Sequence, residues 1–106
     1  RSRAIYPQSC IIPVQHIAAS PHEIKRIAWC TGAAEDGIVQ AADHAVDAYI
    51  SGEISERTVY LARELGVHYF AAGHYATERY GVQALGEMLA IQHGLEHHYV
   101  ALDNPV

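Results

Sequence analysis

The chain has 106 residues, of which half are hydrophobic and 18% are charged, and its formal net charge is −5. This length allows one small domain, and the composition is that of a globular chain rather than a disordered one. The acidic balance without a Lys/Arg cluster argues against nucleic acid as a partner, and no apolar run approaches the roughly 20 residues of a membrane helix.

The first third of the chain predicts two strands joined by a short helix. Residues 1–13 have no hydrophobic period and predict an irregular N-terminal segment, followed by an α/β lobe over residues 14–106. Residues 14–18 predict a short strand, and residues 20–23, Ser-Pro-His-Glu, have the spacing of a capping box and predict a brief helix. Residues 27–30 form a nearly continuous apolar run, which is typical of a strand buried on both faces.

The middle of the chain predicts a helix, a strand and a second helix. Apolar residues recur at helical spacing over residues 35–46 and predict an amphipathic helix of about three turns. Residues 48–50 predict a strand that ends at Ser51-Gly52. Ser55 is then the expected N-cap of a helix that ends at Gly66. The buried side of this helix is expected to include Val59, Ala62 and Leu65.

The last third predicts a strand, a long helix and a closing strand. The apolar residues 67–72 predict the strand, and the helix is expected from about Ala76 to His93, with Gly94 as its stop. The helix residues expected to face the core are Val82, Leu85, Met88 and Leu89. Residues 97–102 alternate and predict the closing strand.

Strands separated by helices predict a mainly parallel sheet of about four to five strands with flanking helices. Right-handed crossovers place the carboxyl ends of parallel strands at one edge of the sheet. Three strands end there in glycine-bearing loops, at residues 31–32, 51–53 and 73–74. We therefore expect three polar residues that are distant in sequence to converge at this edge, namely Glu53, His74 and Glu78.

His74 and Glu78 are the candidate metal ligands. Their i, i+4 spacing places both side chains on one face of a helix, and an imidazole nitrogen and a carboxylate oxygen can hold the same divalent ion. The alternative is a simple helix start, in which Glu78 favours the positive end of the helix dipole and His74 is a polar loop residue.

Glu53 is the candidate catalytic residue. It follows the strand that neighbours the His74 loop, and it is interpreted as a general base or as a hydrogen-bonding partner of His74. The alternative is an acidic residue that only stabilises the start of the following helix.

The remaining histidines and cysteines carry no prediction of a site. His97 and His98 would point to opposite faces of a strand, and His93 is explained by its position at a helix end. Surface or satisfied core positions are expected for His16, His22, His44 and His68. Cys10 and Cys30 are expected to be reduced and packed as small hydrophobic side chains, which indicates a cytoplasmic protein. Tyr69, Tyr75 and Tyr80 cluster around the His74 loop and could line a pocket or an oligomer contact.

Three motifs carry a resemblance to a known family. Residues 27–32 (IAWCTG), 47–56 (DAYISGEISE) and 72–81 (AGHYATERYG) resemble the C-terminal half of the GTP cyclohydrolase 1 type 2 homologues, also described as Nif-three-like proteins. The final residues 103–106 (DNPV) look like the usual C-terminus of that family. The resemblance extends over nearly the whole chain from about Pro13.

The resemblance implies a protein about twice as long, with two α/β lobes, a pair of divalent metal ions between them and a ring-shaped homohexamer. His74 and Glu78 match the family's two C-terminal ligands, whereas the three N-terminal ligands have no counterpart here. We therefore expect a fragment, also indicated by the start at Arg1, that holds half of a dinuclear site for Zn, Fe, Mn or Mg. The family pattern is broken at Ala33-Ala34, where more glycine is usual, and at Tyr75, where a second histidine is frequent.

The function implied by the resemblance is that of a metal-dependent hydrolase-type enzyme acting on a ring-containing or phosphate-bearing small molecule. The alternative is a ring-forming scaffold that binds metal or a partner protein and has a regulatory role without catalysis.

Overall fold

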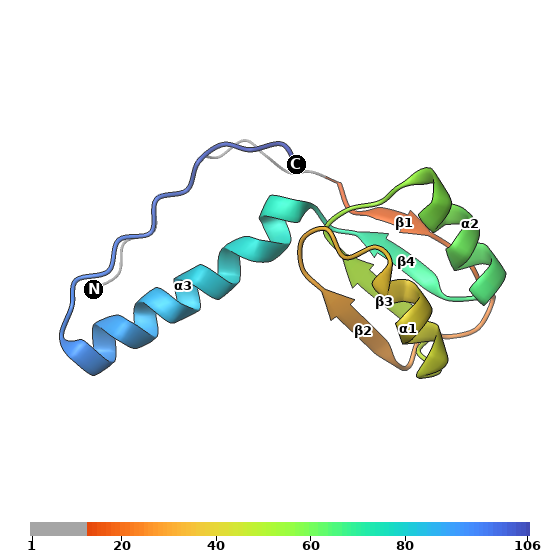
Figure 1. Ribbon diagram of the computed structural model, residues 1–106, viewed down its shortest axis with the longest axis horizontal. Helices are drawn as coiled ribbons and strands as arrows, with labels where there is room; N and C mark the ends of the chain where they lie inside the picture. The colour runs from red at the N-terminus through yellow and green to blue at the C-terminus, as the bar shows by residue number, and fades with distance from the viewer. Residues whose placement is uncertain (1–12) are drawn as a thin grey trace.

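The computed structural model describes residues 13–106, in which a four-stranded sheet carries two helices on one face and a third helix extends away from the sheet (Figure 1). The strands are β1 (Gln15–Ile17), β2 (Ile27–Cys30), β3 (Ala48–Ser51) and β4 (His68–Ala71). The helices are α1 (Gly37–Asp43), α2 (Glu56–Leu65) and α3 (His74–His93). The expected N-terminal segment lies outside the described residues except for Pro13.

The sheet is mixed, with the strand order β1-β4-β3-β2. Strands β2, β3 and β4 are parallel, as expected from the crossover helices α1 and α2 between them. Strand β1 pairs antiparallel with β4, so the prediction of a mainly parallel sheet is only partly right. No helix follows β1, and the right-handed crossover argument therefore does not apply to that strand.

The segment between β1 and β2 is not the brief helix predicted from the capping-box spacing of residues 20–23. The Ser20 hydroxyl instead accepts a hydrogen bond from the His22 N–H at 3.2 Å, which closes a local turn. The N–H groups of Lys25 and Arg26 both donate to Asp47 Oδ2, at 2.8 and 2.7 Å. These two bonds lower the pKa of Asp47. They also fix the backbone just before β2, and the same two N–H groups are then not available for hydrogen bonds within a helix.

The core lies between the sheet and the helices α1 and α2. The cross-strand neighbours Tyr49 and Tyr69 are both buried there, with ring centroids 5.9 Å apart. Ile38 of α1 and Ala62 of α2 are completely buried against them.

The opposite face of the sheet has no helix over it among the described elements, which corrects the prediction for residues 27–30. Ile27 and Trp29 on β2 are 51% and 69% exposed, so this strand is an edge strand and is not buried on both faces. Cys30 is a free and exposed cysteine, so the prediction that it is packed as a small hydrophobic side chain is wrong. Cys10 lies outside the described residues.

The predicted ends of α2 are confirmed, whereas α1, predicted over residues 35–46, is shorter at both ends. Ser55 is the N-cap of α2, with its N–H donating to Thr58 Oγ1 at 3.1 Å, and Gly66 ends the helix at φ 66°. Leu65 was predicted to be buried but is 40% exposed. Helix α1 has 7 residues, about two turns instead of three.

Helix α3 begins and ends where predicted, within two residues, but its apolar stripe is not part of the core. The exposed fractions are 58% for Val82, 51% for Leu85, 46% for Met88 and 38% for Leu89. Residues 97–102 form no strand, with only Val100 in an isolated bridge, and the tail runs back beside α3 (Figure 1).

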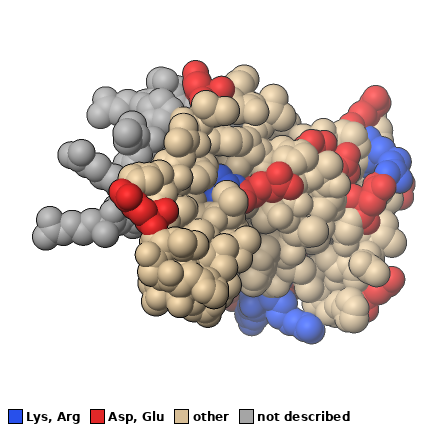
Figure 2. Space-filling view, turned by 60° about the vertical axis from the view of Figure 1, so that its left-hand side comes forward, with Lys and Arg blue, Asp and Glu red and all other residues tan. Residues whose placement is uncertain are grey.

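The surface carries no broad basic area on the face shown in Figure 2, where Lys and Arg are scattered and uncharged residues predominate. None of the described helices is both long and apolar enough to cross a bilayer.

Candidate metal centre

The three glycine-bearing loops stack on one another at the carboxyl edge of the parallel strands. The Gly52 N–H donates to the Gly32 carbonyl at 3.0 Å, and the Gly73 N–H donates to the Gly52 carbonyl at 3.1 Å. The predicted convergence of these loops at one edge of the sheet is therefore confirmed by backbone contacts.

Glycine is favoured at two of these positions, at Gly32 by the positive φ angle and at Gly52 by close contacts with neighbouring backbone atoms. Gly32 has φ +71°, and a Cβ there would collide with the Glu78 carboxylate. A Cβ on Gly52 would lie 2.6 Å from the Gly32 carbonyl oxygen and 2.7 Å from the His74 Cα. The absence of side chains thus brings the first turn of α3 down onto the two neighbouring loops.

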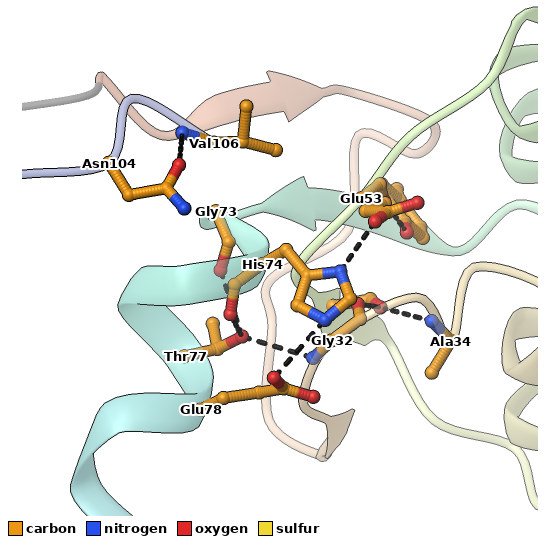
Figure 3. Close-up of polar contacts among 11 residues, drawn as sticks. Gly32, Ala34, Glu53, Gly73, His74, Thr77, Glu78, Asn104 and Val106 are labelled. Atoms are coloured by element: carbon orange, nitrogen blue, oxygen red, sulfur yellow. Dashed lines mark hydrogen bonds and ion pairs between the residues drawn. The ribbon is translucent and has the colours of Figure 1, made fainter.

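Thr77 connects the first turn of α3 to the neighbouring loops through hydrogen bonds. This residue was not predicted from the sequence. Its hydroxyl accepts a hydrogen bond from the Gly32 N–H at 3.1 Å and lies 2.8 Å from the Gly73 carbonyl oxygen (Figure 3). A hydroxyl one turn after the N-cap glycine is the sequence signal that could have revealed it.

His74 lies between the two predicted carboxylates and contacts both (Figure 3). Its Nδ1 is 2.5 Å from Glu53 Oε1, and its Nε2 is 3.1 Å from Glu78 Oε2. The side chains are 35% exposed for His74, 38% for Glu53 and 52% for Glu78, so the group is open to solvent and to small ligands. The structure therefore brings together all three residues that were expected to converge.

The carboxylates favour the protonated form of the imidazole. The hydrogen bond with Glu53 is the main cause that raises the pKa of His74, partial burial opposes it, and the charge of Glu78 adds to the increase. A cation held between Nε2 and the Glu78 carboxylate would satisfy the same negative charges as the proton does.

The donor set fits part of a divalent metal site. His74 Nε2 and Glu78 supply one nitrogen and one carboxylate on the same face of α3, and Glu53 on the opposite ring nitrogen is placed as the carboxylate that orients a metal-binding histidine. Within residues 13–106 no three His, Cys, Asp or Glu side chains are arranged as a complete site. These residues present two donor groups on one face of α3 and one carboxylate on the opposite ring nitrogen.

Tyr69 supports Glu53 from the core. Its hydroxyl donates to the Glu53 backbone carbonyl, while its ring is completely buried, and this burial raises the pKa of Tyr69 to about 12. Tyr69 is thus a core residue that fixes the height of the Glu53 loop. Of the other two predicted tyrosines, Tyr80 is 61% exposed, whereas Tyr75 lines a cavity described below.

Tyr69→Phe is expected to lower the free energy of unfolding by about 1 kcal/mol, because the Glu53 carbonyl loses its buried hydrogen-bond donor. Urea unfolding followed by circular dichroism measures the change. Tyr60→Phe is the matched control, since the Tyr60 hydroxyl bonds Glu56 at the exposed surface of α2. Equal losses in the two variants would show that the Tyr69 hydroxyl does not support the loop.

The other histidines lie apart from this group. His16 and His68, for which surface or satisfied core positions were expected, contact each other across β1 and β4, with His16 Nε2 3.1 Å from His68 Nδ1. His97 and His98 are not on a strand, and His98 pairs with Glu96 at 2.8 Å. None of these residues reaches the His74 group through a described hydrogen bond.

Comparison with known proteins places the chain among its relatives. A family model described as Duf34/NIF3 (NGG1p interacting factor 3) matches residues 3–105. The GTP cyclohydrolase 1 type 2 homolog of Vibrio cholerae is 55% identical over 93 residues, which are 86% of this chain and 37% of that protein. The protein of the same name from Allochromatium vinosum is also 55% identical, over 88% of this chain and 37% of its own length.

Solved structures agree with these matches. The protein ybgI, described as of unknown function, superimposes with a TM-score of 0.83 at 42% identity, over 88% of this chain and 38% of that chain. Reduced HcgD from Methanocaldococcus jannaschii has a TM-score of 0.70 at 26% identity, over 81% of this chain and 36% of its own. The chain therefore spans little more than a third of the length of the relatives that it matches.

Proposed function

The chain belongs to the Duf34/NIF3 family, and from this membership we propose that it binds a divalent metal ion and supplies half of the dinuclear centre of a metal-dependent hydrolase-type enzyme. The observation that carries the proposal is the contact of His74 with Glu78 on one side of the ring and with Glu53 on the other. The other half of the site comes from residues outside the chain, and a homohexameric ring is the proposed assembly.

Each of the three side chains has its own task in the proposed centre. His74 Nε2 and the Glu78 carboxylate would hold the ion, which can be Zn, Fe, Mn or Mg. Glu53 accepts a hydrogen bond from the His74 Nδ1–H, which keeps the ring in the tautomer that leaves Nε2 free to bind, and the proposed catalytic task of Glu53 is to take a proton during the reaction. When bound, a divalent ion acts as a Lewis acid and makes a water molecule more acidic.

The substrate is proposed to be a small molecule that carries a ring or a phosphate group. The name of the curated relatives points to GTP as one member of this class. The proposed reaction is hydrolytic, and the open position of His74 and Glu78 at the sheet edge leaves room for such a molecule.

Calorimetric titration with Zn²⁺ and Mn²⁺ tests the metal site directly. We expect Glu78→Gln to weaken binding at least about tenfold, because a ligand loses its charge. Glu64→Gln is the matched control, since Glu64 is an exposed residue on α2. The same affinity in wild type and Glu78→Gln would show that the Glu78 carboxylate is not a metal ligand.

The enzymatic role is tested by a second experiment. It measures the metal-dependent turnover of GTP and of a panel of phosphate esters by a polypeptide that carries both lobes. The expected result is turnover that His74→Ala abolishes. Equal turnover with and without His74 would refute the enzymatic role even if the metal binds.

A further inference from the structure

A cavity of about 370 Å³ adjoins the candidate metal centre, between the first turns of α3 and the returning tail. Glu78, the carboxylate partner of His74, is one of the residues that line this cavity, so the cavity is adjacent to the proposed metal-binding pair. The tail is held there by a hydrogen bond from the Tyr75 N–H to the Val106 carbonyl oxygen at 2.9 Å. The volume lies within the range of small-molecule sites, roughly 300–1,000 Å³.

Arg79 is the cationic side chain that lines this cavity, and most of its N–H donors are not used in the described hydrogen bonds. A guanidinium carries five N–H donors, and the described contacts of Arg79 use one of them, from NH2 to the Tyr80 hydroxyl at 3.0 Å. The guanidinium also lies 5.0 Å from the centre of the Tyr80 ring, which fixes its plane. Its Nε is buried, with no hydrogen-bond partner among residues 13–106, and no carboxylate in that range forms an ion pair with Arg79.

Two tyrosine hydroxyls complete the polar lining of the cavity. Tyr75 and Tyr99 lie 3.3 Å apart through their oxygens, and this hydrogen bond raises the pKa of Tyr99, so the hydroxyl stays neutral and can donate. Only one of the two protons is used in the bond between them. At least one O–H therefore remains for a ligand in the cavity.

We propose that Arg79, Tyr75 and Tyr99 form a subsite for the phosphate group of a small-molecule substrate that reacts at the neighbouring His74–Glu78 centre. The subsite rests on the proposed function for its place in catalysis, but its binding chemistry is independent of the metal. A planar guanidinium can donate two parallel hydrogen bonds to a phosphate, and a hydroxyl can supply a third.

The apolar wall of the cavity strengthens this interaction and defines the rest of the ligand. Val82, Val100 and Leu102 line the remainder of the space, and a less polar surrounding increases the attraction between a phosphate and Arg79. The same wall suits the carbon skeleton or ring of a phosphorylated molecule.

Glu78 makes anion binding depend on the state of the metal centre. Glu78 is a lining residue of the cavity, and its negative charge repels a phosphate bound there when no cation is present. Neutralising Glu78 should therefore strengthen phosphate binding while it weakens the binding of a metal ion. A purely structural role of Glu78 would not explain stronger phosphate binding together with weaker metal binding.

Titration of the chain with inorganic phosphate, followed by ³¹P NMR in a buffer containing a chelator, tests the subsite without metal. We expect saturable binding in wild type, a loss of at least about tenfold in Arg79→Gln, and unchanged binding in Arg63→Gln, a matched control on α2. Binding that is absent in wild type at about 50 mM phosphate, or equal in wild type and Arg79→Gln, would overturn the proposal.

Two further variants keep the test decisive if Arg79→Gln fails to fold. Tyr99→Phe should weaken phosphate binding about threefold through the loss of one donor, and Glu78→Gln should strengthen it. No change in both variants would refute the subsite. If a polypeptide that carries both lobes fails to bind Zn²⁺ while phosphate binding still requires Arg79, the proposed metal function fails and the phosphate subsite stands.

Discussion

Gly52→Ala is expected to lower the free energy of unfolding by about 3 kcal/mol, at the upper end of the usual cost of overpacking. The new Cβ would lie 2.6 Å from the Gly32 carbonyl oxygen, 2.7 Å from the His74 Cα and 3.0 Å from the Gly32 nitrogen. All three are backbone atoms, so no side chain can rotate away to relieve the contact. The loops must separate, and the hydrogen bonds that stack them are lost with the packing.

Thermal unfolding followed by circular dichroism measures this effect, and a decrease of about 15 °C in Tm is expected for a chain of this size. Gly81→Ala is the matched control, because nothing lies within 4 Å of the Cβ position at Gly81 in the interior of α3. That substitution should stabilise the helix by up to about 1 kcal/mol. A Tm in Gly52→Ala that equals wild type would mean that the three loops do not stack as described.

In a polypeptide that carries both lobes, His74→Ala is expected to reduce the affinity for Zn²⁺ at least about a hundredfold, because it removes the nitrogen ligand that this chain is proposed to supply. Calorimetric titration measures the loss, with His44→Ala as the control for an exposed histidine outside the site. Similar affinities in His74→Ala and wild type would place the metal elsewhere.

The pH dependence of metal binding provides a sharper test of Glu53. A proton competes with the ion for His74, and the pKa of His74 is raised above 6.5, chiefly by Glu53, so metal binding should be lost as the pH falls through that raised value. In the metal-free chain the same shift adds stability below pH 6.5, which is lost as the pH rises through the raised pKa.

Glu53→Gln should therefore shift the midpoint of the metal-binding pH profile to lower pH, because the main cause of the raised pKa is removed. It should also weaken binding at pH 8 by roughly 10–100-fold, because the imidazole loses the carboxylate that orients it. An NMR titration of the His74 ring and Zn²⁺ titrations across pH measure the two effects. An unchanged midpoint would show that Glu53 does not control His74.

The geometry of the candidate site was predictable from sequence because local rules and topology act together there. Each parallel strand ends in a glycine-bearing loop, and the crossovers α1 and α2 force these loops to one edge, so Glu53 and His74 meet although 21 positions separate them. Thr77 escaped notice because its partners, Gly32 and Gly73, are defined only when the loops are in contact.

The errors share a physical cause, which is that a local pattern does not specify its tertiary partner. The stripe from Val82 to Leu89 is apolar at helical spacing, but periodicity does not reveal whether a surface is present to cover it. Ser20 is a residue type that favours an N-cap, but the N–H groups of Lys25 and Arg26 donate to Asp47 and do not enter a helix. The direction of β1 depends on the shape of that same connecting segment, and local propensity does not determine it.

The exposed surface of α3 also affects the thermodynamics of unfolding. The heat capacity change and the denaturant dependence of unfolding both scale with the surface that unfolding newly hydrates. Since α3 has no buried residue and one face of the sheet is open, both quantities should be small for 106 residues. The resulting transition is broad, and its stability curve is flatter than that of a domain whose helices are all packed.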